Sequence, residues 1–404
     1  MERSEFARLA SMAPVPVRQG RMLAGAVLAA ALGACAVAED EGGTRIVEST
    51  LASSWQSTGP WTPEEDLRLS GPPGGYFGIV GALTTDSRDN IFVLDGMAQQ
   101  IHVFAPDGAH LRTVGGKGEG PGEFRMATAL AIGPGDSLWV TDPMTRRYSV
   151  FGPNGGFARG LTRGINGEAN GERCSLTVNG SYLEWATRFP NEERTGDLSD
   201  IDLLHFHPVR VSTSTDEQDT LPRLEFTPQM ADMPSMGMRR PVWIAPALRR
   251  TFDCSGSLWF AQSGEYRLYK RTLDGDTTVI TSLVDARPAD VNEADRDEIR
   301  RVFEGRPDVL ADQLRALPEK KPIIEAMFVD GAGHLFVIPE TSRVEPGTAI
   351  DVFREDGTFV GRMPVPETVT LTYEWAAHAT PDYLLFAGAD DAGTPYVTRL
   401  RIRR

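Results

Sequence analysis

Hydrophobic and polar positions alternate in short runs along most of this chain, and turn residues separate the runs. Residues 81–114 contain four of them: ALTTD, NIFVLD, IHVFAPDG and AHLRTV. Alternation over four to eight residues predicts half-buried β-strands, and an Asp-Gly pair between two runs predicts a tight hairpin. The pattern therefore predicts a meander of four antiparallel strands.

This four-strand unit repeats. Residues 128–161 align with 81–114 without a gap, so that Asp95 falls on Asp142, 47 positions later. Weaker copies lie at 174–188, 251–280, 326–363 and 376–404. Repeats of 40 to 50 residues with four strands each are typical of β-propellers. The predicted fold class is all-β, a six-bladed β-propeller of four-stranded antiparallel blades.

The ends of the repeat region predict how the ring closes. The sixth copy has runs for three strands before Arg404, whereas 64–70 is a strand-like run that belongs to no unit. Pairing these two segments would complete the last blade and remove an open sheet edge. We therefore expect a propeller over 61–404 that is closed by strand 64–70.

One segment, 288–322, has helical periodicity. Ile299, Val302 and Phe303 follow the i, i+3, i+4 spacing, and the break GRP separates them from a second run, VLADQLRAL. This predicts a small helical insertion between blades 4 and 5. Its two short helices either gate the central channel or pad the face of the ring.

Several runs resemble NHL-type repeats: DNIFVLD, IHVFAPDGAHLRTVGGKGEGPGEF and SLWVTDPMTRRYSVFGPNG. From about residue 60 to 404 the chain is similar to bacterial secreted or lipoprotein six-bladed β-propellers of that type, with the first two units matching best. The resemblance implies either a recognition scaffold or an enzyme, because such propellers include lactonases and other hydrolases with channel-bound calcium, and a lyase with zinc and histidines. Fold alone does not choose between these classes.

The N-terminus has the pattern of an export signal. Residues 22–34 form an apolar run preceded by Arg18 and Arg21. As a helix this run rises only about 20 Å, which is too short to cross a bilayer. It ends in LGAC, which resembles the lipobox of bacterial lipoproteins.

We therefore expect a lipoprotein-type signal peptide over 1–34, lipidation at Cys35 and a flexible tether over 35–60. The alternative is an ordinary secretory signal followed by a chance cysteine. The resemblance places the mature protein in the cell envelope, lipid-anchored in the outer membrane and facing the periplasm or the exterior. Whether translation starts at Met1 or Met12 stays open.

Composition narrows the expected partners. Asp and Glu number 56 against 41 Lys and Arg, a formal net charge of −15 at pH 7, which argues against nucleic acid. The expected partner is an envelope protein, peptide or glycan, with membrane contact through the lipid anchor only and a monomeric chain. Cys174 and Cys254 either pair or remain buried thiols, and the repeat alignment favours thiols because it separates them too far for a disulfide.

Loop length distinguishes the two ends of the ring. Turns between first and second strands, and between third and fourth, are short and rich in Asp-Gly and Asn-Gly. Connections between second and third strands, and from blade to blade, are long. The long ones are 188–200, 227–250, 285–322 and 340–348. Long loops gathered at one end predict a binding face there.

The glycine-dense segment 114–124, VGGKGEGPGEF, resembles a phosphate-binding loop only superficially. A Walker loop needs Gly-Lys-Ser/Thr and a following helix, whereas Lys117 precedes Gly118 and the segment leads into a strand. We interpret it as a blade-to-blade connection, with a backbone anion nest as the minor alternative.

Arginines in the long loops are candidates for binding a carboxylate or phosphate group of a partner. They are Arg188, Arg239, Arg240, Arg249 and Arg250. Loop arginines are also commonly just solvated, so the composition of these loops alone does not establish a site.

Three residues are candidates for the mouth of the channel. Asp95 and Asp142 end second strands, and His378 falls in a first strand that faces the channel. The aspartates would act as calcium ligands or a catalytic carboxylate, or they would only cap the following turn. No complete metal-ligand set or catalytic motif is visible, so no cofactor is expected, calcium is the one metal kept open, and we favour a non-catalytic role.

Overall fold

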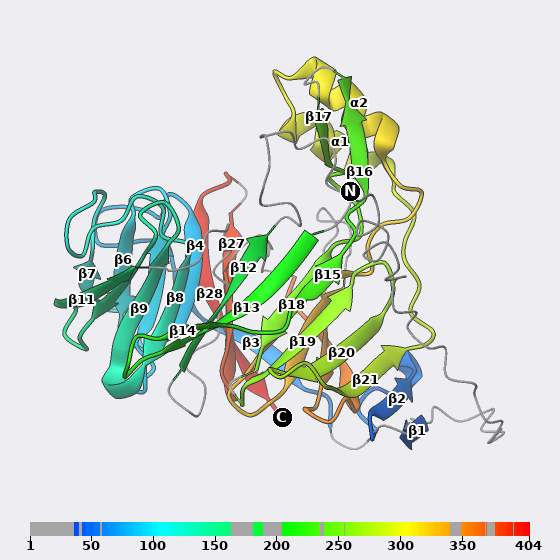
Figure 1. Ribbon diagram of the computed structural model, residues 1–404, viewed down its shortest axis with the longest axis horizontal. Helices are drawn as coiled ribbons and strands as arrows, with labels where there is room; N and C mark the ends of the chain where they lie inside the picture. Colours follow the sequence, from blue (N-terminus) through cyan, green and yellow to red (C-terminus); the bar gives the residue numbers. More distant parts are fainter. Residues whose placement is uncertain are drawn as a thin grey trace, which may run out of the picture.

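The computed structural model of this chain is a six-bladed β-propeller with a small helical insertion (Figure 1). The residues that it describes are 36–39, 43–56, 59–162, 181–188, 204–234, 238–253, 255–339, 349–367, 369, 376–390 and 392–404. The expected signal peptide, Cys35, Cys174 and Cys254 lie outside these residues. No helix in the described part of the chain is long and apolar enough to cross a membrane.

The first two blades follow the predicted meander strand by strand. Blade 1 consists of β4 (Val80–Thr85), β5 (Ile91–Asp95), β6 (Gln100–Phe104) and β7 (His110–Val114). Blade 2 consists of β8 (Ala129–Gly133), β9 (Ser137–Asp142), β10 (Arg147–Phe151) and β11 (Phe157–Thr162), with the 3-10 turn η2 (Pro134–Asp136) between β8 and β9. All neighbouring strands are antiparallel.

Blades 4 and 5 keep this plan, and blade 3 keeps the part of it that the structure describes. The described strands of blade 3 are β12 (Ser181–Arg188), β13 (Leu204–Ser212), β14 (Gln218–Thr220) and β15 (Leu224–Phe226), the last two both pairing with β13. Blade 4 has β18 (Leu248–Phe252), β19 (Ser257–Gln262), β20 (Arg267–Thr272) and β21 (Thr277–Leu283). Blade 5 has β22 (Ile324–Val329), β23 (Leu335–Pro339), β24 (Ala349–Phe353) and β25 (Phe359–Pro364).

Blade 6 joins the two ends of the ring. Its first three strands are β26 (Ala377–Ala379), β27 (Tyr383–Ala389) and β28 (Pro395–Arg403). The fourth is β3 (Thr62–Leu69), which pairs antiparallel with β28 from Leu69 opposite Val397 to Thr62 opposite Arg403. The orphan run at 64–70 therefore closes the propeller, as its sequence predicted.

The helical insertion forms as two helices, α1 (Glu293–Val302) and α2 (Pro307–Ala316), between blades 4 and 5. Asn292 accepts the Asp295 backbone N–H and Asp295 accepts that of Asn292, which is a reciprocal capping box. Gly305, at φ +80°, lies in the link between the helices. A hairpin absent from the sequence expectation, β16 (Met230–Met233) and β17 (Met238–Pro241), packs against α2.

The segment before β3 is not the free tether expected over 35–60. β2 (Arg45–Ser49) joins blade 4 as a fifth strand, parallel to β21, and β1 (Ala36–Glu39) pairs with β2. After the turn η1 (Leu51–Ser53), the Trp55 N–H donates to the Val360 carbonyl of blade 5 at 2.7 Å. We call residues 44–56 and 59–61 the belt, because they cross the outer edges of blades 4 and 5 before β3 enters blade 6.

The core is divided among the blade interfaces. Among the described residues, six apolar clusters each join two consecutive blades, and a seventh joins the hairpin to α2. Trp139 lies between blades 2 and 3, and Trp259 between blades 4 and 5. Both tryptophans therefore pack between consecutive blades.

Candidate binding face and central channel

The ring has two unlike ends. The turn face carries the described turns from first to second and from third to fourth strands. The insertion face carries the described connections from second to third strands and from blade to blade. On the turn face, single carboxylates organise the turns. Asp86, Asp253 and Asp330 each accept two backbone N–H groups, from residues two and four positions later, at 2.8–3.0 Å.

On the insertion face, the Asp95 and Asp142 carboxylates each hydrogen-bond to two different loop segments. Asp95 accepts the N–H groups of Gly78, at 2.8 Å, and of Met97, at 2.9 Å. Asp142 accepts from Arg125 and Thr145 at 2.8 and 3.1 Å. Both are buried, at 3% and 0% exposure. Each carboxylate ties a blade-to-blade connection to the next turn, which is the capping role.

The glycine-dense segment 114–124 turns its carbonyls, not its amides, toward a charged group. The Arg147 guanidinium donates to the carbonyls of Glu119, Gly120 and Glu123 at 3.2, 3.0 and 2.7 Å. The Gly120 N–H is already bound to the Glu123 carboxylate at 2.8 Å. A bound oxyanion would lie against the partially negative carbonyl oxygens beside Arg147 and would be repelled by them. The loop is therefore a connection between blades, as predicted.

The close packing of this loop explains one of its glycines. Gly115 has φ +77°, and a Cβ there would lie 2.1 Å from the Phe124 ring. Only glycine fits such a position.

Arg249 and Arg250 do not lie in a loop, which corrects the expectation for both. They belong to β18, the innermost strand of blade 4. Arg249 pairs with Glu325 of the neighbouring β22 at 3.2 Å. Arg250 is 8% exposed, with its guanidinium 4.3 Å from the centre of the Phe206 ring of blade 3. Both therefore bind adjacent blades.

The structure does not describe the side-chain contacts of the other three arginine candidates. Arg188 is the last residue of β12, and Arg239 and Arg240 lie in β17. Their side chains are outside the described part of the structure.

The hairpin β16–β17 and the helices α1 and α2 form one unit on the insertion face, which we call the cap. The Gln313 amide donates to the Pro241 carbonyl at 3.2 Å and accepts the Trp243 N–H at 2.9 Å. The Trp243 ring meets Phe303 edge-on, with centroids 5.7 Å apart. Figure 1 shows the cap projecting from one side of the ring.

The chain segments that follow β17 and α2 connect the cap to the ring, and both are attached to blade 4. The Ser263 hydroxyl accepts the Ala247 N–H at 2.8 Å, and the Ser263 carbonyl accepts the Ile323 N–H at 2.6 Å. The buried Lys321 ammonium lies 3.1 Å from the Asp295 carboxylate of α1. The cap is therefore attached through hydrogen bonds and a buried ion pair.

Five large apolar side chains are exposed on the part of the insertion face formed by blades 1 and 2. This apolar array consists of Tyr76 (75% exposed), Ile79 (50%), Met97 (65%), Met126 (44%) and Met144 (52%). Met126 follows Ile79, and Met144 follows Met97, by the same 47 positions that relate Asp142 to Asp95. The array was not predicted from the sequence, although apolar residues that recur in turns were a usable signal.

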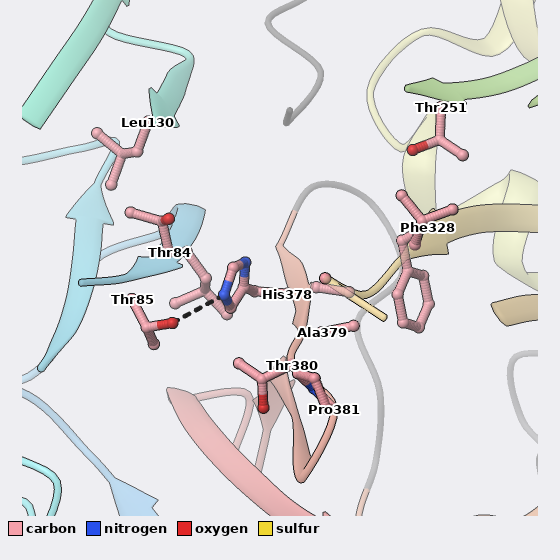
Figure 2. A pocket seen from close by; sticks show the side chains of 13 residues that line it. Thr84, Thr85, Leu130, Thr251, Phe328, His378, Ala379, Thr380 and Pro381 are labelled. Atoms are coloured by element: carbon pink, nitrogen blue, oxygen red, sulfur yellow. Dashed lines mark hydrogen bonds between the residues drawn. The ribbon is translucent and has the colours of Figure 1, made fainter. Parts of the chain in front are cut away.

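The central channel contains a cavity of about 210 Å³ lined by first strands. His378 of β26 faces it, and the His378 Nε2 lies 2.9 Å from the Thr85 hydroxyl (Figure 2). Thr84, Thr251 and Phe328 line other sides. Thr85 and His378 lie near the turn face, where first strands end, whereas Asp95 and Asp142 lie at the ends of second strands. The structure therefore does not bring the three channel-mouth candidates together.

A short series of hydrogen-bonded polar side chains extends from His378 away from the channel. Thr85 also hydrogen-bonds Tyr383, whose hydroxyl donates to the Asp89 carboxylate at 2.8 Å. Burial, followed by the bond to Asp89, raises the pKa of Tyr383. Within the described ranges, no three His, Cys, Asp or Glu side chains come together as a possible metal site.

A family model and a solved structure support the fold. A family model described as 6-bladed beta-propeller matches residues 77–157. A solved structure of a Bacteroides fragilis protein classed as a candidate for export is similar, with TM-score 0.52 and 14% identity, covering 85% of this chain and 96% of that one. Virginiamycin B lyase from Staphylococcus aureus has TM-score 0.44 and 12% identity, covering 84% and 99%. No curated protein sequence matches.

Proposed function

We propose that this protein is a lipid-anchored propeller of the bacterial cell envelope, with NHL-type repeats, whose insertion face recognises a protein or peptide partner. The apolar array carries the proposal. Scattered exposed apolar residues are normal, but a group of large ones on one face marks an interaction surface. Here the group is also repeated on two consecutive blades.

The chemistry of the array favours apolar side chains of a protein over a glycan. Burying one large apolar side chain contributes about 1.5–3 kcal/mol before the cost of association is subtracted. Three of the five residues are methionines, whose flexible thioethers adapt to irregular apolar surfaces. Glycan sites instead depend on aromatic platforms and convergent hydrogen-bond donors, and Tyr76 is the one aromatic residue in the array.

Replacing Met97 and Met144 by Gln tests this function. The partner is first identified in cells by photo-crosslinking from position 144, with position 111 on the outer edge of blade 1 as the comparison. The Kd of the purified pair is then measured. We expect M97Q/M144Q to weaken binding at least about tenfold, as loss of a central contact typically does.

The matched control is L111Q/F157Q, which changes two apolar residues that are also exposed, at 47% and 38%, but lie on outer strands. It should bind as the natural chain does. Equal Kd values for both double variants would disprove recognition through the array.

The enzymatic alternative has its own measurement. Elemental analysis of the purified mature protein, with thermal unfolding in calcium and in chelator, tests for a channel metal. A stoichiometric metal whose removal abolishes an activity would replace the scaffold function by a catalytic one.

A further inference from the structure

The belt determines where the chain leaves the ring. β2 is the fifth strand of blade 4, and its Val47 is fully buried. The Thr44 hydroxyl donates to the Thr277 carbonyl at 3.1 Å, and the Arg45 guanidinium donates to the Asp356 carbonyl at 2.9 Å. From Thr44 onward the belt is therefore part of the folded ring.

The residues just before the belt stay on the same rim. β1 folds back along β2, with Ala36 opposite Glu48 and Glu39 opposite Arg45. In Figure 1, β1 and β2 lie at one margin of the molecule, and β7 of blade 1 lies at the opposite margin. Ala36 thus emerges at the outer edge of blade 4.

We infer that the outer rim of blade 4 faces the lipid bilayer, so that the propeller stands on its edge and its insertion face is turned sideways. The inference rests on the proposed anchor at Cys35, the residue next to Ala36. It also places the apolar array, on blades 1 and 2, away from the membrane and open to a partner.

Chain length decides between this orientation and free tumbling. The expected tether of 26 residues would reach about 90 Å when extended. With β1 paired, one peptide unit separates Cys35 from the ring. Even with β1 detached, the nine residues before Thr44 reach only about 30 Å. A compact domain of this size is roughly 50 Å across, so the ring cannot turn over to stand on the rim of blade 1.

Fluorescence quenching on vesicles tests the orientation. The mature chain, with Cys174→Ser and Cys254→Ser, is coupled through the Cys35 thiol to a maleimide lipid in phosphatidylcholine vesicles that carry a headgroup nitroxide. A fluorophore is attached to a keto amino acid that replaces either Glu48 or Leu111, both exposed. Cys→Ala replacements serve if the serine variant does not fold.

We expect quenching at position 48 to be several-fold stronger than at position 111. The control is the same protein with Cys35 blocked, for which both positions should be unquenched. Equal quenching at the two positions, or stronger quenching at 111, would overturn the orientation. Chemical coupling makes this result independent of natural lipidation, which mass spectrometry of the N-terminal peptide from cells tests separately.

Discussion

At the scale of single residues, the arginine candidates show that a local sequence pattern does not predict where a residue lies in the fold. Arg239-Arg240 and Arg249-Arg250 are alike in sequence, yet one pair lies in the cap hairpin and the other in the innermost strand of blade 4. The repeat is too weak there to place the start of β18. The aspartates were easier to interpret, because a carboxylate after a strand caps a turn wherever its neighbours lie.

His102 is a buried titratable residue whose surroundings oppose its charge. It is 4% exposed, and its Nδ1 lies 3.0 Å from the Thr113 hydroxyl. Burial lowers the pKa of His102 below its usual 6.5, and repulsion from His110 adds to this, while attraction to Asp95 opposes it. The folded state therefore binds this proton less readily than the unfolded state.

We predict that neutral, buried His102 contributes to the free energy of unfolding. This contribution is complete above pH 6.5 and is lost as the pH falls from 6.5 through the lowered pKa of His102. The loss from one such group is at most about 1.4 kcal/mol per pH unit. Urea unfolding of the natural chain and of H102N at pH 7.5, 6.5 and 5.5 measures it. The variant should lose less stability on acidification, and parallel pH profiles would contradict the assignment to His102.

At the scale of elements, charge fixes how the closing strand pairs. β3 carries three consecutive acidic residues and β28 carries Arg399, Arg401 and Arg403. Asp66 bonds Arg399 and Arg401 at 2.7 and 2.8 Å. Partial burial raises the pKa of Asp66, but the hydrogen bonds from both arginines outweigh this and hold it below 3.8. A slipped register would break these pairs.

A double-mutant cycle on Asp66→Asn and Arg399→Met should give a coupling energy of about 0.5–3 kcal/mol in urea unfolding, because Arg399 is 8% exposed. The control cycle, Glu64→Gln with Arg403→Met, removes an ion pair that is 50% and 69% exposed. It should give less than about 1 kcal/mol. Equal coupling in the two cycles would show that the Asp66–Arg399 pair has no special role in closure.

Most blade elements could be predicted, and the belt could not, for a physical reason. Blades are meanders, so each strand lies beside its sequence neighbour and short turns mark the boundaries. β2 pairs in parallel with β21, more than 200 residues later, and no turn signal links such partners. RIVES is also too short to distinguish from a chance run. The cap hairpin escaped prediction because methionine, proline and arginine obscure its alternation.

At the scale of the whole molecule, the stabilising apolar contacts are distributed over the blade interfaces around the ring. Each blade interface has its own apolar cluster, and the cluster between blades 5 and 6 includes Trp61 at the end of the belt. The cluster between blades 6 and 1 includes Leu69 of β3. Loss of residues 61–69, which comprise Trp61 and β3, therefore removes apolar contacts at two interfaces and leaves the β28 edge unpaired.

Two shortened chains separate closure from the belt. A chain that begins at Gly59 keeps β3, so we expect a folded monomer with a lower Tm than the full mature chain. A chain that begins at Gly71 lacks β3, and we expect it to aggregate or lose its near-ultraviolet circular dichroism. Size-exclusion chromatography with light scattering measures both outcomes. A native monomer from the shorter chain would show that strand closure is dispensable.

The pairing of β3 with β28 also has a consequence for biosynthesis. During translation β3 emerges before the strands of blades 1 to 5, and its partner β28 emerges after them. A ribosome that stops early releases a product whose ring cannot shut, with two strand edges exposed to proteases and chaperones. The geometry thus gives the cell a way to distinguish finished copies from unfinished ones.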